Sequence, residues 1–458
     1  MVRGDHRPPG RIVAADIDGF IERGVRAVGL RLSGDVTASA AESRAALRVL
    51  DGLSPHRQEQ VGEPIAMILR QLSYSLLQHG DLDGAIAAAG RSAALTKVSA
   101  TRHRAVSYVV GAHAYAGQLN LARAALARID PPGRPRRRES ARPHPMAVVG
   151  ETFLLLDEGD FDAALRVVRR CESYVETAEF WPFLAAVRLL ARIGRGESPA
   201  EAGRLQTLLD APTPPPGTGA NTATRTLAGL LAIAWLAAGR LAAAERVLSA
   251  HHRRAPELVP ARALRLLLTG RPATVLDRLS SWSELPGHTT RTRAATLSIA
   301  AAAAGRAGHD ALAVDLIGRA HEAAADEGLR MHLSLLPVAD RRALADTARR
   351  RGGDAVADYL DTVRGDLLPA TLWLPVLTRR ESIVLTALAS VSSRDEIARR
   401  LSVSPNTVKT QLRQIYRKLG VTNREAAIRM AARHELIDRP AADGLRRSDL
   451  VPAAATPS

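Results

Sequence analysis

Apolar residues recur at helical spacing along most of the chain, from near the first residue to about residue 370. These segments are rich in Ala, Leu and Arg, and they show no strand-like alternation of apolar and polar positions. Turn residues interrupt them at intervals that are too short for βαβ units. The pattern therefore predicts an all-α fold in which one helix follows another.

A weak repeat lies within this helical region. Each copy has an apolar helical stretch, a glycine that ends it, and a small or β-branched residue five positions later. The repeat occurs at Gly80/Ala85, Gly117/Ala122, Gly159/Ala164, Gly239/Ala244, Gly270/Val275 and Gly308/Ala313, and a degenerate copy contains Gly194 or Gly196. Because the small residue lets a second helix approach the first closely, each copy is predicted to be a helical hairpin.

Short hairpins cannot bury their apolar faces alone, so they are expected to stack into a solenoid. The units resemble tetratricopeptide-like repeats over about residues 60–330, with a longer and less regular spacing. A generic all-α domain with ordinary glycine turns is the alternative. Two stretches cannot be helical, namely residues 131–145, interpreted as a solvated basic loop, and the proline-rich residues 210–224.

Residues 376–438 show a different pattern, with four helix starts in close succession. Three starts are Ser/Thr-x-x-Glu capping boxes, at Thr378/Glu381, Ser393/Glu396 and Thr422/Glu425. The fourth is Ser404-Pro405, a capping residue followed by proline at the first helical position. They predict helices over 379–390, 394–402, 405–419 and 423–433. The short connection between the second and third is the one that a helix-turn-helix requires.

The third of these helices has an apolar side and a polar side without acidic residues. The apolar stripe, predicted to be buried, consists of Val408, Leu412, Ile415 and Leu419. The opposite side carries Asn406, Thr410, Arg413 and Arg417, with Lys409 at its edge. A solvated polar face would usually include Asp or Glu, and none occurs from residue 402 to 423. Such a face suits the DNA major groove, since Arg binds guanine edges and both cations neutralise phosphates.

This segment resembles the LuxR-type (LuxR/FixJ/NarL) DNA-binding domain. The resemblance rests on Leu377-Thr378-x-Arg380-Glu381, Glu396-Ile397-Ala398, Leu401, Ser404, Thr407-Val408-Lys409, Ile415, Lys418-Leu419-Gly420-Val421 and Arg424. It implies that helix 405–419 reads DNA and that helix 423–433 joins two domains. The resemblance and the polar face together identify seven candidate DNA-binding residues, which are Asn406, Thr407, Lys409, Thr410, Arg413, Arg417 and Lys418.

The segment departs from the LuxR pattern at three places. Val391 stands where many members have glycine, Arg394-Asp395 replaces the usual Asn-Lys, and Gln411 replaces a common histidine. Asp395 removes one phosphate contact, so the affinity for DNA is expected to be modest. These departures keep a second function open, a helical-repeat interaction scaffold whose C-terminal module is vestigial or only dimerises.

The distribution of charge supports the DNA-binding interpretation. The chain carries a net charge of +16, and residues 376–438 contain 12 Arg and Lys against six Asp and Glu. The charge density in this module is about four times that of the rest of the chain, as expected for a phosphate-binding surface. Two of the three lysines in the chain, Lys409 and Lys418, lie in it.

Motifs for other functions are absent from the sequence. HExxH, GxSxG and GxxxxGK[ST] do not occur, and no His, Cys and carboxylate cluster has metal-ligand spacing, so no enzyme, metal or cofactor is predicted. The single cysteine, Cys171, excludes an internal disulfide and fits a reducing cytoplasm. It is interpreted as inert and partly buried. The longest apolar stretch, residues 227–239, is too short to span a bilayer.

The predicted architecture has four parts. Residues 1–368 form a helical repeat domain, 369–375 a linker, 376–438 a LuxR-type helix-turn-helix domain and 439–458 a flexible tail. The first part resembles the helical repeats of large ATP-binding LuxR regulators, without the ATPase. The predicted function is a cytoplasmic transcriptional regulator that binds double-stranded DNA as a homodimer. Its repeat domain would sense a peptide, protein or small-molecule effector.

Overall fold

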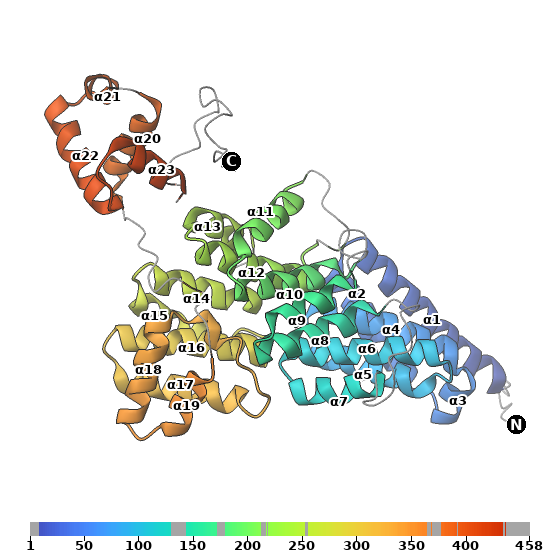
Figure 1. The fold of residues 1–458 in the computed structure, drawn as a ribbon. Helices are drawn as coiled ribbons and strands as arrows, with labels where there is room; N and C mark the ends of the chain where they lie inside the picture. Colours follow the sequence, from blue (N-terminus) through green and yellow to red (C-terminus); the bar gives the residue numbers. More distant parts are fainter. Residues whose placement is uncertain are drawn as a thin grey trace, which may run out of the picture. The chain divides into compact units, whose positions relative to one another are not determined.

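The computed structural model describes residues 9–129, 143–171, 179–211, 217, 219–251, 255–363, 368, 377–391, 393–433 and 436 (Figure 1). Every regular element in these ranges is a helix, so the all-α prediction is confirmed. Most of residues 1–372 form one compact unit and residues 373–458 belong to a second. The arginines of the predicted basic loop, the linker 369–375 and the tail 439–458 lie outside the described residues.

The helices α1 to α19, here called the helical array, precede the C-terminal module. Their first half consists of α1 Pro9–Leu32, α2 Val36–Asp51, α3 Pro55–Gln60, α4 Gly62–His79, α5 Leu82–Leu95, α6 Ser99–Ala116, α7 Leu119–Ile129, α8 Pro145–Glu158, α9 Phe161–Arg169 and α10 Trp181–Gly194. The second half consists of α11 Ser198–Leu209, α12 Thr222–Ala237, α13 Leu241–Ser249, α14 Val259–Leu268, α15 Pro272–Ser283, α16 Thr290–Arg306, α17 Asp310–Ala324, α18 Val338–Arg350 and α19 Asp354–Asp361. Among the described residues of the array, two short 3-10 helices lie between these elements, η2 Pro256–Leu258 and η3 Leu333–Leu335.

Consecutive helices of the array pack as pairs. The pairs include α1/α2, α4/α5, α6/α7, α8/α9, α14/α15, α16/α17 and α18/α19. The first helices of neighbouring pairs also contact each other, as α4, α6 and α8 do side by side in Figure 1. These contacts agree with helical hairpins, while the assignment to the tetratricopeptide class stays a prediction.

Left-handed glycines end the first helices of the hairpins, as predicted. The six glycines of the regular repeat have φ values between 71° and 101°. In the degenerate copy Gly196 has this role, with φ 73°, whereas Gly194 is helical and lies against the ring of Phe161. The residues five positions after the six glycines are all buried, with at most 1% exposure. The spacing therefore identified both the helix ends and a buried position on each second helix.

Two further units escaped the sequence analysis, one at each end of the array. Gly34, with φ 90°, precedes the buried Ser39, and Gly352, with φ 76°, precedes the buried Ala357. The hydroxyl of Ser39 donates to the carbonyl oxygen of Ala27 at 2.7 Å, so this unit uses a small polar residue at the close contact. The five-residue spacing as stated fits Gly352/Ala357, and it fits Gly34/Ser39 if serine is allowed at the small position.

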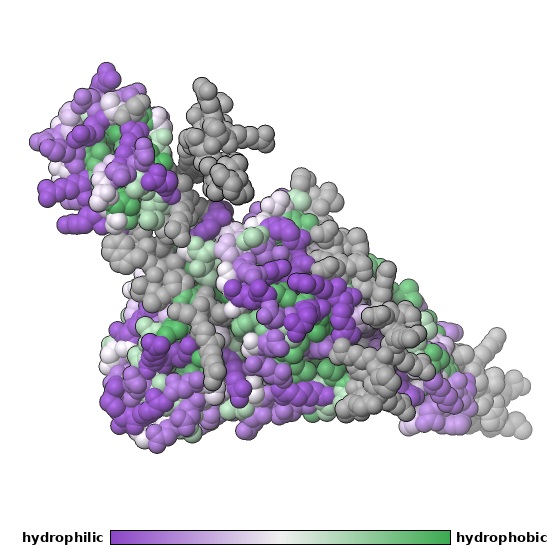
Figure 2. All heavy atoms as spheres, in the orientation of Figure 1, coloured by the Kyte–Doolittle hydropathy of each residue, from purple (hydrophilic) through white to green (hydrophobic). Residues whose placement is uncertain are grey.

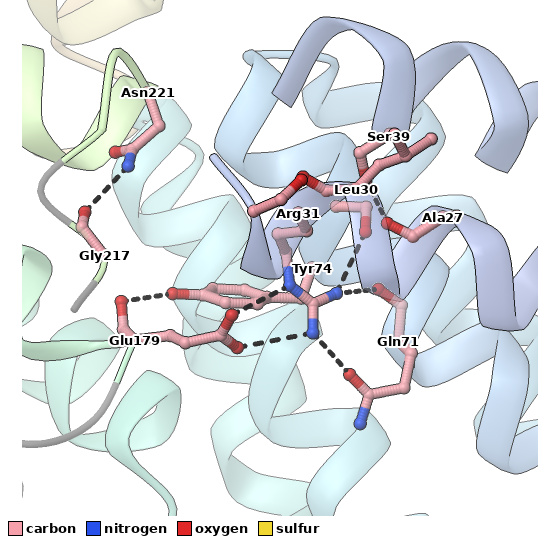
Figure 3. Close-up of polar contacts among 11 residues, drawn as sticks. Ala27, Leu30, Arg31, Ser39, Gln71, Tyr74, Glu179, Gly217 and Asn221 are labelled. Atoms are coloured by element: carbon pink, nitrogen blue, oxygen red, sulfur yellow. Dashed lines mark hydrogen bonds and ion pairs between the residues drawn. The ribbon is translucent and has the colours of Figure 1, made fainter. Parts of the chain in front are cut away.

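Buried polar contacts join parts of the array that are far apart in the sequence. In Figure 3 the guanidinium of Arg31 on α1 lies over the ring of Tyr74 on α4, 5.1 Å from its centroid. Arg31 Nε donates to Glu179 Oε1 at 3.2 Å, and the Tyr74 hydroxyl donates to the Glu179 carbonyl oxygen at 2.6 Å. Burying the Arg31 charge is tolerated because its hydrogen bonds are satisfied.

A second buried cluster surrounds Asp157 at the end of α8. Its carboxylate accepts hydrogen bonds from the backbone N–H groups of Arg330 and Met331, both at 2.9 Å. Arg291 Nη1 at the start of α16 donates to the other carboxylate oxygen at 2.6 Å. Because these partners lie more than 130 residues away, the cluster connects the middle and the late helices of the array.

Cys171 is fully buried rather than partly buried, and its Sγ donates to the carbonyl oxygen of Pro143 at 3.6 Å. Burial raises the pKa of the thiol to about 11, although Arg170 acts in the opposite direction. The neighbouring arginine therefore does not make it a reactive thiolate. No helix in the described ranges combines the length and hydropathy that a membrane-spanning segment needs.

Candidate nucleic-acid interface

The C-terminal module contains four helices, α20 Arg379–Ser390, α21 Arg394–Arg400, α22 Pro405–Leu419 and α23 Arg424–Arg433 (Figure 1). Their bounds agree with the predicted ones within two residues. The predicted apolar stripe of α22 is buried, with at most 5% exposure for any of its four residues. It packs into one core with residues of α20, α21 and α23.

The predicted capping residues begin the first two helices. Thr378 Oγ1 accepts from the backbone N–H of Glu381 at 3.3 Å, and the Glu381 carboxylate accepts from the Thr378 N–H at 2.6 Å. This reciprocal pair is a complete capping box. Ser393 accepts from the N–H of Glu396 at 3.2 Å and caps α21 in one direction.

Of the two remaining predicted helix starts, one is confirmed and the other was wrong. Ser404 Oγ accepts from the N–H of Thr407 at 3.1 Å and begins α22 as predicted. The capping box at Thr422 was wrong, because Asn423 Oδ1 accepts from the N–H of Ala426 at 2.8 Å and caps α23 instead. Asparagine is at least as good an N-cap as threonine, so the position closer to the helix took this role.

The turn between α21 and α22 depends on Ser402, which the sequence analysis did not single out. Ser402 has φ 53° and is the one described residue other than glycine with a positive φ. The N–H of Val403 donates to the carbonyl oxygen of Ala398 at 3.0 Å, which is the Schellman hydrogen bond of a helix end. This left-handed residue makes the short connection of the helix-turn-helix.

Six of the seven candidate residues lie on the exposed side of α22. They are Asn406, Thr407, Lys409, Thr410, Arg413 and Arg417. Figure 2 shows hydrophilic side chains over most of the visible face of this domain. Within the described part of the chain, the side chains of Lys409, Arg413 and Arg417 make no hydrogen bond or ion pair. Three cations of this face therefore remain available to a ligand.

The two threonines of this face are engaged locally. Thr410 Oγ1 donates to the carbonyl oxygen of Asn406 at 3.0 Å. Thr407 Oγ1 lies 2.8 Å from Ser404 Oγ at the helix start. Their hydroxyl groups help to hold the first two turns of α22, while both residues remain exposed.

The seventh candidate, Lys418, is placed differently. Its Nζ donates to Glu381 Oε2 at 2.7 Å, which ties α22 to the start of α20. The carboxylate side chain is 5% exposed and that of the lysine 31%. Burial disfavours ionisation of Glu381, but the hydrogen bonds from Lys418 and Thr378 prevail and lower its pKa. The ion pair directs the ammonium group of this half-buried lysine towards the start of α20.

Two departures from the LuxR pattern have structural explanations. Val391 has φ −132° and ψ 143°, an extended conformation that does not require glycine. Arg424 Nη2 donates to the carbonyl oxygens of Val391 and of Leu388, the latter at 2.8 Å, and so satisfies the end of α20. Asp395 lies in the first turn of α21, where a negative charge is favourable for the helix dipole. Neither departure disturbs the domain.

The four-helix core, the short turn and the cationic face of α22 define a helix-turn-helix domain. Residues 375–431 match the family model described as "Bacterial regulatory proteins, luxR family", so the C-terminal module is a LuxR-family helix-turn-helix domain. This assignment confirms the resemblance seen in the sequence. The match covers the module alone.

The relatives include two regulators that each match a short stretch of this chain. The probable transcriptional regulatory protein NarL of Mycobacterium tuberculosis is 47% identical over 64 residues, which are 14% of this chain and 30% of NarL. The HTH-type transcriptional regulator MalT of Yersinia pestis is 41% identical over 66 residues, 14% of this chain and 7% of MalT. The chain thus covers less than a third of either relative.

Proposed function

We propose that the protein is a sequence-specific DNA-binding transcriptional regulator. The observation that carries the proposal is the exposed side of α22, where Lys409, Arg413 and Arg417 have no partner among the described residues. The absence of Asp and Glu from residue 402 to 423 means that no carboxylate of this segment would repel a phosphate. The names of both relatives are those of transcriptional regulators.

In the proposed complex α22 enters the major groove. Arg413 at its centre reads a guanine through O6 and N7, a contact worth about 1–3 kcal/mol of discrimination. Asn406, Lys409 and Thr410 face neighbouring bases or their phosphates. Arg417 and Thr407 contact the backbone and set the register of the helix. Lys418 contributes indirectly, because its ion pair with Glu381 holds α22 in place.

The regulator is proposed to act as a homodimer on a two-fold site. Helix α23 would join the two domains, and it presents Glu425 and Arg429 at its exposed surface. Half-sites one helical turn apart, about 34 Å, would then be read by two copies of α22. The helical array would bind a peptide, protein or small-molecule effector in the cytoplasm and shift how two domains pair.

The direct test compares DNA binding of the full chain with that of two variants in a mobility-shift series. Arg413→Ala is expected to lower the ratio of specific to non-specific affinity by about 5- to 150-fold, the equivalent of 1–3 kcal/mol. Arg399→Ala, a change of an exposed arginine on α21, is the matched control and should leave the ratio unchanged. Equal ratios for all three proteins would refute the assignment of α22 as the reading helix.

Genome-wide immunoprecipitation separates this function from an interaction scaffold. A regulator is expected to recover a recurring two-fold DNA motif, whereas a scaffold would give only diffuse signal.

A further inference from the structure

A cleft of about 840 Å³ lies beside the reading face of α22, between that helix and the start of α21. Its apolar floor includes Ile397 and Leu412. Five cationic side chains line it, those of Arg394, Lys409, Arg413, Arg417 and Arg424. No Asp or Glu is among its lining residues. Such a concentration of positive charge, without an internal counter-charge, favours an anionic ligand.

The cleft is continuous with the proposed DNA surface. Three of its cations, Lys409, Arg413 and Arg417, are also members of the exposed face of α22. Arg424 is different, because its guanidinium already satisfies the carbonyl oxygens at the end of α20. The cleft therefore extends the cationic face of α22 towards the start of α21.

Arg394 is the cation that α21 adds to this surface. It is exposed, and within the described ranges its side chain makes no hydrogen bond or ion pair. The neighbouring Asp395 is exposed but does not line the cleft. In the pair Arg394-Asp395, which replaces the Asn-Lys usual in LuxR domains, the positive charge has moved by one residue. Neighbouring residues on a helix point in directions about 100° apart, so this change places the positive charge of Arg394 on the side of α21 that lines the cleft.

We propose that Arg394 binds a DNA phosphate of its own in this cleft, beside the backbone contact made by Arg417, which extends the interface from α22 to α21. The inference rests on the proposed function and adds a phosphate contact that replaces the one lost with Asp395. Arginine suits this role because its planar guanidinium binds two phosphate oxygens at once. The contact adds affinity and orientation but carries no sequence information.

The test is the salt dependence of DNA binding by the full chain, measured by fluorescence anisotropy with a labelled duplex that carries the selected site. Arg394→Ala is expected to reduce the slope of log K against log [KCl] by about 0.9, the value for one lost phosphate contact. The ratio of specific to non-specific affinity should not change. Arg394→Lys should keep the slope, and Arg399→Ala on the same helix should behave like the unchanged protein.

A methylphosphonate scan of the duplex gives a second measurement. Neutralising the contacted phosphate should weaken binding by the unchanged protein and should not weaken binding by Arg394→Ala further. An unchanged slope in Arg394→Ala, or equal sensitivity of both proteins at every phosphate, would overturn the phosphate contact while leaving the proposed function intact. Failure of the unchanged protein to prefer any DNA sequence would instead refute the proposed function.

Discussion

Replacing Lys418 by methionine is expected to destabilise the C-terminal domain without removing a phosphate contact. Methionine keeps an unbranched apolar stem of similar length but removes the ammonium group that donates to Glu381 at 2.7 Å. The carboxylate of Glu381 is only 5% exposed, so it would remain buried without its counter-charge. An unpaired buried charge is among the costliest local defects in a folded protein.

The magnitude follows from the exposure of the two partners. Breaking a fully buried ion pair costs about 3–5 kcal/mol, and losing a hydrogen bond to a charged group about 1.5–3 kcal/mol. Water reaches 31% of the Lys418 side chain, and the Thr378 N–H continues to donate to the carboxylate. We therefore expect a loss of about 2 kcal/mol, towards the lower end of these ranges.

Hydrogen exchange measured by mass spectrometry on the full chain is the appropriate assay, since it reports the local stability of residues 377–433. A loss of about 2 kcal/mol corresponds to about 30-fold faster exchange of the most protected amides in this range. The neighbouring Arg417 is the matched control, because it is exposed and has no partner in the described part of the chain.

Arg417→Met should leave exchange unchanged and reduce the salt slope of DNA binding by about 0.9. Lys418→Met should speed amide exchange in the C-terminal domain and leave the salt slope of DNA binding unchanged. If Lys418→Met lowered the slope and left amide protection intact, Lys418 would be a phosphate contact and the ion pair would be dispensable.

Three further predictions concern backbone strain and buried titration. Ser402→Gly should stabilise the C-terminal domain by about 1 kcal/mol, measured by hydrogen exchange, because glycine adopts its positive φ without strain. Gly159→Ala should cost about 1 kcal/mol in thermal unfolding of the array, and Gly117→Ala more, since only the latter's Cβ would lie within 3.2 Å of other side chains. Burial lowers the pKa of His332 to about 4, so the unfolded chain binds a proton first. Stability of the array should therefore fall as the pH drops from 6.5 to 4, less steeply in His332→Gln.

The C-terminal domain was predictable from the sequence because its signals are local. The capping residues, the proline after Ser404 and Gly420 each act within a few residues, and together they placed the helix bounds within two residues. The periodicity of α22 separated its buried and exposed sides for the same reason. The left-handed Ser402 was missed because the residue type alone does not signal a positive φ.

The contacts of Lys418 and of the helical array depend on tertiary structure, which local patterns do not contain. The LuxR resemblance made Lys418 a candidate DNA-binding residue, yet its partner Glu381 lies 37 residues earlier in the chain. Arg31 and Glu179 are 148 residues apart, and no motif in the sequence connects them. The glycine spacing located the hairpins, but it carried no information on which distant helices would meet.

Selection of bound duplexes from a randomised pool, carried out with the full chain, measures whether the protein recognises a particular DNA sequence through α22. We expect enrichment of a two-fold motif with half-sites about one helical turn apart. The Arg413→Ala variant should lose preference for one base pair in each half-site. A pool that stays random after repeated selection, or an identical motif for Arg413→Ala, would contradict recognition through α22.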